Sequence, residues 1–217
     1  LYTDEFLQLV KSLNYFEIDL VLDVGANEGQ FANLLRKYNY KKKIVSFEPS
    51  LSAYNKLINY SNNDHKWTIY PRCAIGSNEI EQRINISNNS VSSSLLDIKN
   101  SKHSDEEIKF LYDEVVNEKK LDSIIPNFLI DYKNIFLKID VQGYEDRVID
   151  GCIKNMNHIK GILVETSTEE IYSGQKLWDE IIYKLLDRGY ELWFVSKGII
   201  NKKNGRNLQN DFCLFRK

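Results

Sequence analysis

The sequence predicts an α/β domain in which a mostly parallel sheet carries helices on both faces. Two observations predict it. Short apolar segments typical of buried strands alternate with amphipathic segments of helical spacing along most of the chain. The length of 217 residues favours one large domain, 1–217, over two, and the 42% hydrophobic content supplies its core.

The first part of the chain predicts a leading helix and then a βαβ unit. Apolar residues at helical spacing indicate a helix over 3–15, and we expect residues 1–19 to form a helical cap over a sheet edge or a cavity mouth. A buried strand at 20–24, a helix at 30–38 and a second strand at 43–47 follow. Further on we expect helices at 51–60, 147–152 and 177–188 and strands at 67–74, 135–139, 162–165, 191–196 and 211–215.

Two regions depart from this alternation. The last two expected strands are joined by the Gly- and Asn-bearing segment 197–210, which indicates a hairpin, an unusual end for a purely parallel sheet. Between 77 and 127 the pattern weakens to an alternating segment at 81–86, a polar tract at 87–94 and a charged segment at 105–119 that we expect to be helical. We interpret 77–127 as an inserted lid or substrate wall, because insertions in α/β folds lie beside the crevice at the strand ends.

The composition argues against several classes of protein. With 29 basic and 31 acidic residues the net charge is -2, so we expect no nucleic-acid partner. The three cysteines, Cys73, Cys152 and Cys213, are too far apart to indicate a disulfide framework or a zinc site, which favours a reducing, cytoplasmic location. We find no apolar segment long enough for an integral membrane helix. The oligomeric state is left open.

A glycine-bearing turn follows the first strand. The segment from Asp23 to Gly29 reads DVGANEG and leads into a helix whose first N–H groups are free to meet a ligand. It matches neither the dinucleotide fingerprint nor a phosphate-binding Walker loop. An acidic residue before the glycines suits the ammonium group of an amino acid, which favours S-adenosylmethionine over NAD. The cofactor-binding candidates in this turn are Asp23, Gly25, Ala26, Asn27 and Gly29.

Two acidic residues at other strand ends extend this site. Glu48 follows Gly29 by 19 residues, close to the separation expected for a carboxylate that accepts hydrogen bonds from ribose hydroxyls. Pro49 and Ser50, directly after it, are included as cofactor-binding candidates. Asp140 ends a further apolar strand and so faces the same crevice, where it is a candidate both for the chemistry and for cofactor contact.

These segments together resemble the FkbM-type methyltransferases, a class I group that depends on S-adenosylmethionine. The resemblance runs from about Leu20 to Glu165, and Gln142 departs from it because Glu is common there. It implies a Rossmann-like seven-stranded sheet with an antiparallel last strand, and O-methylation, often of sugar hydroxyls in glycans or natural products. It also implies that Asp23, Gly25 and Gly29 hold the methionine part, Glu48 the ribose and the backbone of Cys73, Ala74 and Ile75 the adenine. The segments that carry the resemblance are DVGANEGQF at 23–31, FEPS at 47–50, SSSL at 92–95, LDSII at 121–125, LKIDVQGYE at 137–145, VIDG at 148–151 and ILVE at 162–165.

Methyl transfer to a hydroxyl needs positioning and a proton acceptor. Among the acidic residues near the strand ends we rank Asp140 first and Glu165 second as the base, and Lys138 beside them is a third catalytic candidate. Asp140 with Glu165 would also suit a divalent cation, but no metal-ligand spacing requires one, so no metal site is predicted.

The acceptor is expected to be a glycan or a small molecule that meets the inserted region. The hydroxyls of Ser92, Ser93 and Ser94 suit a carbohydrate, and His103 lies in the same region. Two alternatives stay open: a non-catalytic binding module that keeps the fold, and an RNA methyltransferase. An intact cofactor pocket argues against the first, and the acidic net charge argues against the second.

Overall fold

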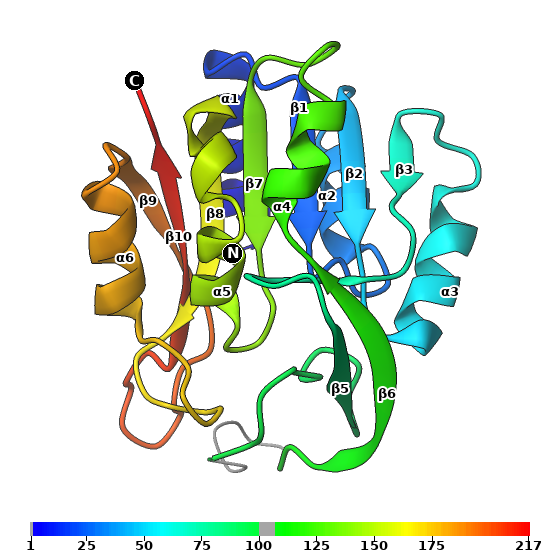
Figure 1. Ribbon diagram of the computed structural model, residues 1–217. Coiled ribbons are helices and arrows are strands. Elements are labelled where there is room, and N and C mark those ends of the chain that lie inside the picture. The colour runs from blue at the N-terminus through cyan, green and yellow to red at the C-terminus, as the bar shows by residue number, and fades with distance from the viewer. Residues whose placement is uncertain (1, 100–106) are drawn as a thin grey trace.

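A large twisted sheet organises the molecule. The structure is a computed structural model that describes residues 2–99 and 107–217. Within those residues the main sheet has seven strands in the order β3-β2-β1-β7-β8-β10-β9 (Figure 1). Its strands are β1 (Leu20–Val24), β2 (Lys43–Phe47), β3 (Trp67–Ile69), β7 (Ile135–Ile139), β8 (Ile159–Ser167), β9 (Glu191–Lys197) and β10 (Gln209–Phe215).

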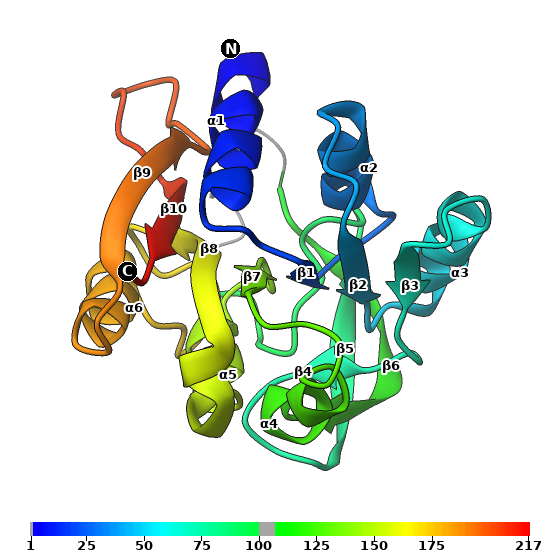
Figure 2. The same cartoon turned by 90° about the horizontal axis from the view of Figure 1, so that it is seen from above.

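The helices lie in two layers, one on each face of this sheet. Seen from above, α1 (Tyr2–Tyr15), α2 (Gln30–Lys37) and α3 (Leu51–Ser61) cover one face (Figure 2). The other face carries α4 (Leu121–Ile124), α5 (Glu145–Asp150) and α6 (Trp178–Leu186), with short 3₁₀ turns at Ile125–Asn127 and Ile153–His158. The expectation of helices on both faces is confirmed.

Strand direction follows the expected pattern. Strands β3, β2, β1, β7 and β8 run parallel to one another, whereas β10 lies antiparallel to both β8 and β9. The terminal hairpin and the antiparallel last strand are therefore confirmed. Because β10 lies between β8 and β9, the hairpin's second strand occupies an interior place in the sheet and its first strand the edge.

Two hydrophobic cores hold the layers together. Side chains alternate along a strand, so Leu20 and Leu22 enter the core under α4–α6, while Val21 between them enters the core under α1–α3. All five residues of β1 and of β7 are buried. These central strands fix the positions of the loops at their carboxyl ends.

A smaller sheet lies beyond the carboxyl ends of the main strands (Figure 1). Within the described residues it consists of β4 (Ala74–Ile75), β6 (Phe110–Lys119) and β5 (Glu81–Ser87), in that order. The expected helix at 105–119 is wrong, because 110–119 form β6, paired antiparallel with β5. The β-branched Val115 and Val116 and the aromatic residues near them favour the extended chain once this partner strand is present.

The expected strand at 67–74 is also wrong in part. It divides into β3, in the main sheet, and β4, in the smaller one. Pro71 lies between them and has no N–H group to donate to a ladder, which explains the break. The other expected elements agree with the structure within a few residues.

Helix α1 and Phe16, the residue after it, pack against α2 and β10, and Phe6 of α1 also lines the cavity described below. The Phe6 ring meets that of Phe31 on α2, with centroids 5.6 Å apart, and the Phe16 ring stacks on Phe215 of β10 at 4.1 Å.

As for membrane insertion, none of the helices within 2–99 and 107–217 combines the length and the apolar character of a membrane span.

Candidate functional site

A cavity of about 590 Å³ opens at the carboxyl ends of the main strands. Its volume lies in the range of sites for small molecules and cofactors, about 300–1,000 Å³. Its walls come from the ends of β1, β2, β7, β8 and β10, from Phe6 of α1, and from residues 90–95, which we call the serine segment. We call the turn of residues 24–29 with Glu48, of which 24–27 and Glu48 line the cavity, the turn side. We call the wall formed by Asp140, Gln142, Glu165 and Asp211 the carboxylate side.

The glycines of the turn side allow close backbone approach. Gly25 has a φ of +74°, and a Cβ atom placed on it would lie 1.7 Å from the main-chain oxygen of Asp140. Gly29 has a φ of +93°, and its Cβ atom would lie 2.7 Å from the Trp67 ring. A side chain at either position would push the turn away from the sheet. The two glycines therefore set where the turn and the start of α2 lie.

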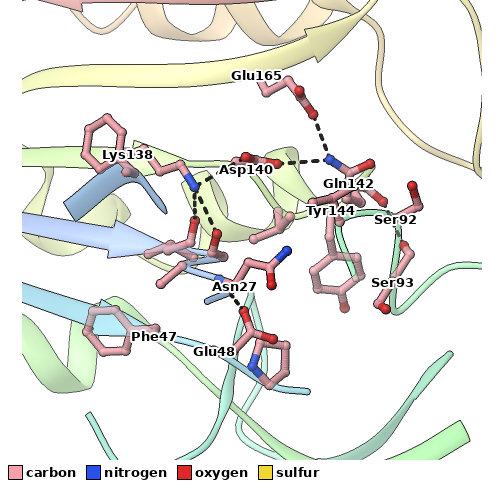
Figure 3. A pocket seen from close by; sticks show the side chains of 18 of the residues that line it. Asn27, Phe47, Glu48, Ser92, Ser93, Lys138, Asp140, Gln142, Tyr144 and Glu165 are labelled. Carbon is pink, nitrogen blue, oxygen red and sulfur yellow. Dashed lines mark hydrogen bonds and ion pairs between the residues drawn. The ribbon is translucent and has the colours of Figure 1, made fainter. Parts of the chain in front are cut away.

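Glu48 anchors this turn through backbone amides. Its two carboxylate oxygens accept hydrogen bonds from the main-chain N–H groups of Asn27 and Ser50, each at 2.8 Å (Figure 3). Burial raises the pKa of Glu48 to about 7 despite these donors. Each oxygen keeps a second lone pair, so the carboxylate has capacity left for two ligand hydroxyls. These donor and acceptor positions fit the ribose of S-adenosylmethionine.

Asp23 lies behind the cavity wall and reaches it through Lys138. Its carboxylate is fully buried, accepts a hydrogen bond from Ser46 Oγ at 3.0 Å and lies 3.5 Å from Lys138 Nζ. Burial raises the pKa of Asp23. Lys138 Nζ also donates to the Gly25 carbonyl at 2.9 Å and lies 3.3 Å from Asp140 Oδ2. Burial opposes the charged ammonium, but Asp140 and Asp23 raise the pKa of Lys138, so it stays protonated.

Two carboxylates face each other on the carboxylate side, with an amide between them (Figure 3). Gln142 Nε2 donates to Asp140 Oδ1 at 3.0 Å and to Glu165 Oε2 at 2.8 Å. Gln209 Nε2 adds a second hydrogen bond to Glu165 Oε2, at 3.1 Å. Both oxygens of Asp140 are thus engaged, one by Gln142 and one by Lys138. Within the described residues, Glu165 Oε1 has no hydrogen-bond partner.

Glu165 shares its surroundings with further negative charge. Asp211 on β10 is directly opposite Glu165 on β8 in the strand register, and both line the cavity. Burial, and then the carboxylates of Asp140 and Asp211, raise the pKa of Glu165 well above its usual value. Burial and Asp140 raise the pKa of Asp211 to about 6. Both carboxyl groups of this wall therefore hold a proton at higher pH than they would in water.

The serine segment covers the cavity, and its hydroxyls have different roles. Ser94 Oγ donates to the main-chain oxygen of Gln142 at 2.7 Å, and Ser93 Oγ accepts a hydrogen bond from Ser87 N at 3.1 Å. Within the part of the chain that the structure describes, the Ser92 hydroxyl has no such partner, although Ser92 lines the cavity. Ser92 is therefore the serine whose hydroxyl is available to a ligand.

Most residues predicted for the site line the cavity. Three cofactor candidates, Asp23, Gly29 and Ser50, lie behind the wall instead, and His103 lies outside the described residues. The sequence interpretation missed Gln209, Asp211 and Tyr172, and the three consecutive polar residues 209–211 give no alternating pattern that would have marked the first two. The predicted residues that line the cavity are Gly25, Ala26, Asn27, Glu48, Pro49, Cys73, Ala74, Ile75, Ser92, Ser93, Ser94, Lys138, Asp140 and Glu165.

The described residues hold no cluster of three or more His, Cys, Asp or Glu side chains arranged for a metal ion. The carboxylates of the carboxylate side instead contact amide and ammonium groups, namely those of Gln142, Gln209 and Lys138.

Comparison with solved structures shows the fold. The methyltransferase domain of a bacterial Hen1 protein is 12% identical, with a TM-score of 0.50 over 97% of each chain. Magnesium protoporphyrin IX methyltransferase from Synechocystis, solved with bound S-adenosylmethionine, is 9% identical, with a TM-score of 0.53 over 99% of this chain and 77% of that one. A candidate RNA methyltransferase from Pyrococcus horikoshii is 11% identical, with a TM-score of 0.50 over 98% of this chain and 81% of that one. All three have the class I methyltransferase fold.

Comparison by sequence identifies the family. A search of curated proteins found no match. The model of the methyltransferase FkbM domain matches residues 23–192, which include the glycine turn, Glu48 and the carboxylate side up to Glu165. The match confirms the resemblance and, with it, S-adenosylmethionine as the cofactor. This chain belongs to the FkbM family of S-adenosylmethionine-dependent methyltransferases.

Proposed function

We propose that this protein transfers the methyl group of S-adenosylmethionine to a hydroxyl of a sugar, in a glycan or in a glycosylated small molecule. The acceptor oxygen forms a bond to the methyl carbon, the carbon–sulfur bond breaks, and the hydroxyl proton passes to a carboxylate. The products are a methyl ether and S-adenosylhomocysteine. The observation that carries the proposal is that Glu165 Oε1, in the wall of a cavity that also contains the glycine turn and Glu48, has no hydrogen-bond partner within 2–99 and 107–217.

Glu165 is the better proton acceptor of the two carboxylates ranked from the sequence. Both Asp140 oxygens already contact donors, whereas Glu165 Oε1 has no partner among the described residues. Burial and the neighbouring carboxylates also raise the pKa of Glu165, which makes it a stronger proton acceptor than an exposed carboxylate. Asp140 then orients the site, because it contacts Lys138 and Gln142 and lies against Gly25.

The acceptor wall is the inserted region 77–127. The serine segment, Ile84 and Ile108 from this region line the cavity opposite the main sheet. Ser92 offers a free hydroxyl, and apolar side chains next to it suit the carbon face of a sugar ring. The cytoplasmic location is part of this proposal, and three buried, unpaired cysteines support it.

An RNA acceptor is the second candidate, because one structural neighbour is described as a candidate RNA methyltransferase. The carboxylate side argues against it. A phosphate backbone brought to this wall would meet the acceptor oxygens of Asp140, Glu165 and Asp211, while the ammonium of Lys138 already pairs with Asp23 and Asp140.

Transfer of labelled methyl groups tests the proposal. The purified protein with labelled S-adenosylmethionine is incubated with a panel of p-nitrophenyl hexosides and, separately, with short RNA oligonucleotides. We expect label on a hexoside hydroxyl, which mass spectrometry then locates. Label on RNA alone would replace the proposal with the second candidate. Tight cofactor binding without transfer to any acceptor would favour a binding module.

A further inference from the structure

The loop after β7 holds Gln142 in an uncommon backbone conformation. Gln142 has a φ of +54° and is followed by Gly143 at +96°. A non-glycine residue in this region is strained and persists where its surroundings fix it. Two contacts do so here: Ser94 Oγ donates to the Gln142 main-chain oxygen at 2.7 Å, and Gly143 N donates to Glu145 Oε1 at 3.0 Å.

This conformation directs the Gln142 amide between two carboxylates (Figure 3). Its two N–H groups are donated to Asp140 Oδ1 at 3.0 Å and to Glu165 Oε2 at 2.8 Å. An ionised carboxylate can accept hydrogen bonds but cannot donate them, so the nitrogen of the Gln142 amide must face the two carboxylates. A neutral group with two donors thus joins two like charges from neighbouring strands, and the ammonium of Lys138 stays with Asp23 and Asp140.

The oxygen of the same amide is turned toward the serine segment. Tyr172 Oη lies 3.2 Å from Gln142 Oε1 and 3.1 Å from the main-chain oxygen of Ser92, so its single hydrogen can be donated to either. Tyr172 is buried. Gln142 is therefore tied to the serine segment through its backbone by Ser94, and Tyr172 lies within hydrogen-bond distance of both its side-chain oxygen and the Ser92 main chain.

We propose that Gln142 is a positioning residue that holds Asp140 and Glu165 in one geometry and couples that geometry to the serine segment. The inference rests on the proposed role of Glu165 as the base. Gln142 keeps Glu165 Oε2 occupied, so that Oε1 is the atom presented to an acceptor. Because Ser92 and Ser94 contact the same network, an acceptor that orders the serine segment also fixes the orientation of the base.

Gln142→Asn tests the amide bridge, meaning the hydrogen bonds from Gln142 Nε2 to Asp140 and Glu165, with a residue that tolerates the positive φ at this position. Asn adopts a positive φ more readily than Gln, so the variant is expected to fold, but its side chain is too short to reach both carboxylates. Gln209→Met is the matched variant: it removes the other amide donor to Glu165 Oε2, and no contact of Gln209 with Asp140 is present among the described residues. Thermal unfolding and calorimetry with S-adenosylmethionine check that both variants keep the fold and the cofactor site.

Two measurements separate charge from position. Carbon-13 NMR titration of labelled Glu side chains, with Glu165→Gln to assign the signal, should show the pKa of Glu165 higher by about one unit in either variant, because each loses a donor to the ionised form. At a pH above the Glu165 pKa that the titration measures in each protein, methyl transfer to the best p-nitrophenyl hexoside should stay at least about tenfold lower in Gln142→Asn but less than about threefold lower in Gln209→Met.

The titration needs neither acceptor nor turnover, so it tests the bridge even if no sugar is methylated and the proposed function fails. An unchanged pKa of Glu165 in Gln142→Asn would overturn the inference. Equal loss of kcat in the two variants at a pH above both measured pKa values would overturn it as well, since Gln142 would then act only as one more donor.

Discussion

The turn side and the carboxylate side of the cavity are built by different means. On the turn side the contacts come from the backbone: main-chain amides of Asn27 and Ser50 donate to Glu48, and Gly25 lies against the main-chain oxygen of Asp140. On the carboxylate side, side chains contact side chains, as the amides of Gln142 and Gln209 do with Glu165. Backbone donors are present in almost any sequence, whereas amide side chains are not.

This difference separates what each wall can tolerate. The turn side depends on the path of the backbone, so a displaced backbone should disrupt all of its contacts together and abolish cofactor binding. The carboxylate side depends on individual groups, so single substitutions should alter the chemistry there and leave cofactor binding intact.

The largest expected effect is at Glu165. Glu165→Gln keeps the shape but removes the basic Oε1 atom, so we expect kcat to fall by about 10²–10⁴-fold. The dissociation constant for S-adenosylmethionine should change by less than about twofold, since Glu48 and the glycine turn are untouched. Single-turnover methyl transfer and calorimetry measure the two quantities. A parallel loss of cofactor affinity would show that the two walls do not act separately.

Gly25 offers the corresponding change on the turn side. Gly25→Ala places a Cβ atom 1.7 Å from the Asp140 main-chain oxygen. We therefore expect the free energy of unfolding to fall by at least about 3 kcal/mol, and cofactor binding to be lost with it. Gly205→Ala is the matched control, because Gly205 has a φ of +75° against +74° for Gly25 and no atom within 4 Å of its added Cβ. That control should cost only about 1–2 kcal/mol, from the backbone alone. Urea unfolding compares them, and equal losses would refute the close-approach argument.

Glu48 gives the turn side a dependence on pH. Its pKa is raised to about 7, and ribose hydroxyls donate to its ionised form. Cofactor affinity should therefore fall as the pH falls through about 7, by about five- to tenfold from about pH 8 to about pH 6. Calorimetry across this range measures it.

Glu48→Ala is the control for this dependence. It should weaken binding at about pH 8 by about tenfold or more, because charged hydrogen bonds to the ribose are lost, and it should flatten the pH profile. A profile that keeps its slope in the variant would assign the titration to another group.

The smallest effect concerns the serine segment. Ser92→Ala removes the free hydroxyl, so we expect the KM for the acceptor to rise about threefold with little change in kcat. Ser94→Ala removes the contact with the Gln142 main chain and should lower kcat instead. Steady-state kinetics of the two variants distinguishes them. The same kinetic pattern in both would mean that the segment acts as a simple lid.

The sequence predicts the central strands of the main sheet well, because the residues within each strand are enough to identify it. The bounds expected for β1, β2 and β7 equal those in the structure, since each is a short apolar segment followed by a turn or loop. The error at 105–119 arises from a contact distant in the chain. Leu111 and Val115 have helical spacing, and only the pairing of β6 with β5 decides between the two conformations.

The same distinction applies to the site. The glycine turn and Glu48 belong to a compact stretch of chain with recognisable spacing, so their place in the cavity wall could be predicted. Asp211 and Gln209 could not, because they reach Glu165 only through the antiparallel entry of β10 beside β8. The burial of Asp23 behind the wall depends on the tertiary contacts with Ser46 and Lys138.

The place of β10 also constrains how the protein is made. Strand β10 follows β9 in the chain but lies between β9 and β8, so β9 cannot join the sheet before β10 has left the ribosome. Until then the growing chain carries β8 as an open, apolar edge, which is the kind of surface that chaperones bind and that invites aggregation. The turn side can form during translation, whereas the carboxylate side, which includes Asp211, is completed last. Nascent chains stalled before residue 209 therefore lack Gln209 and Asp211 from the wall that contains Glu165.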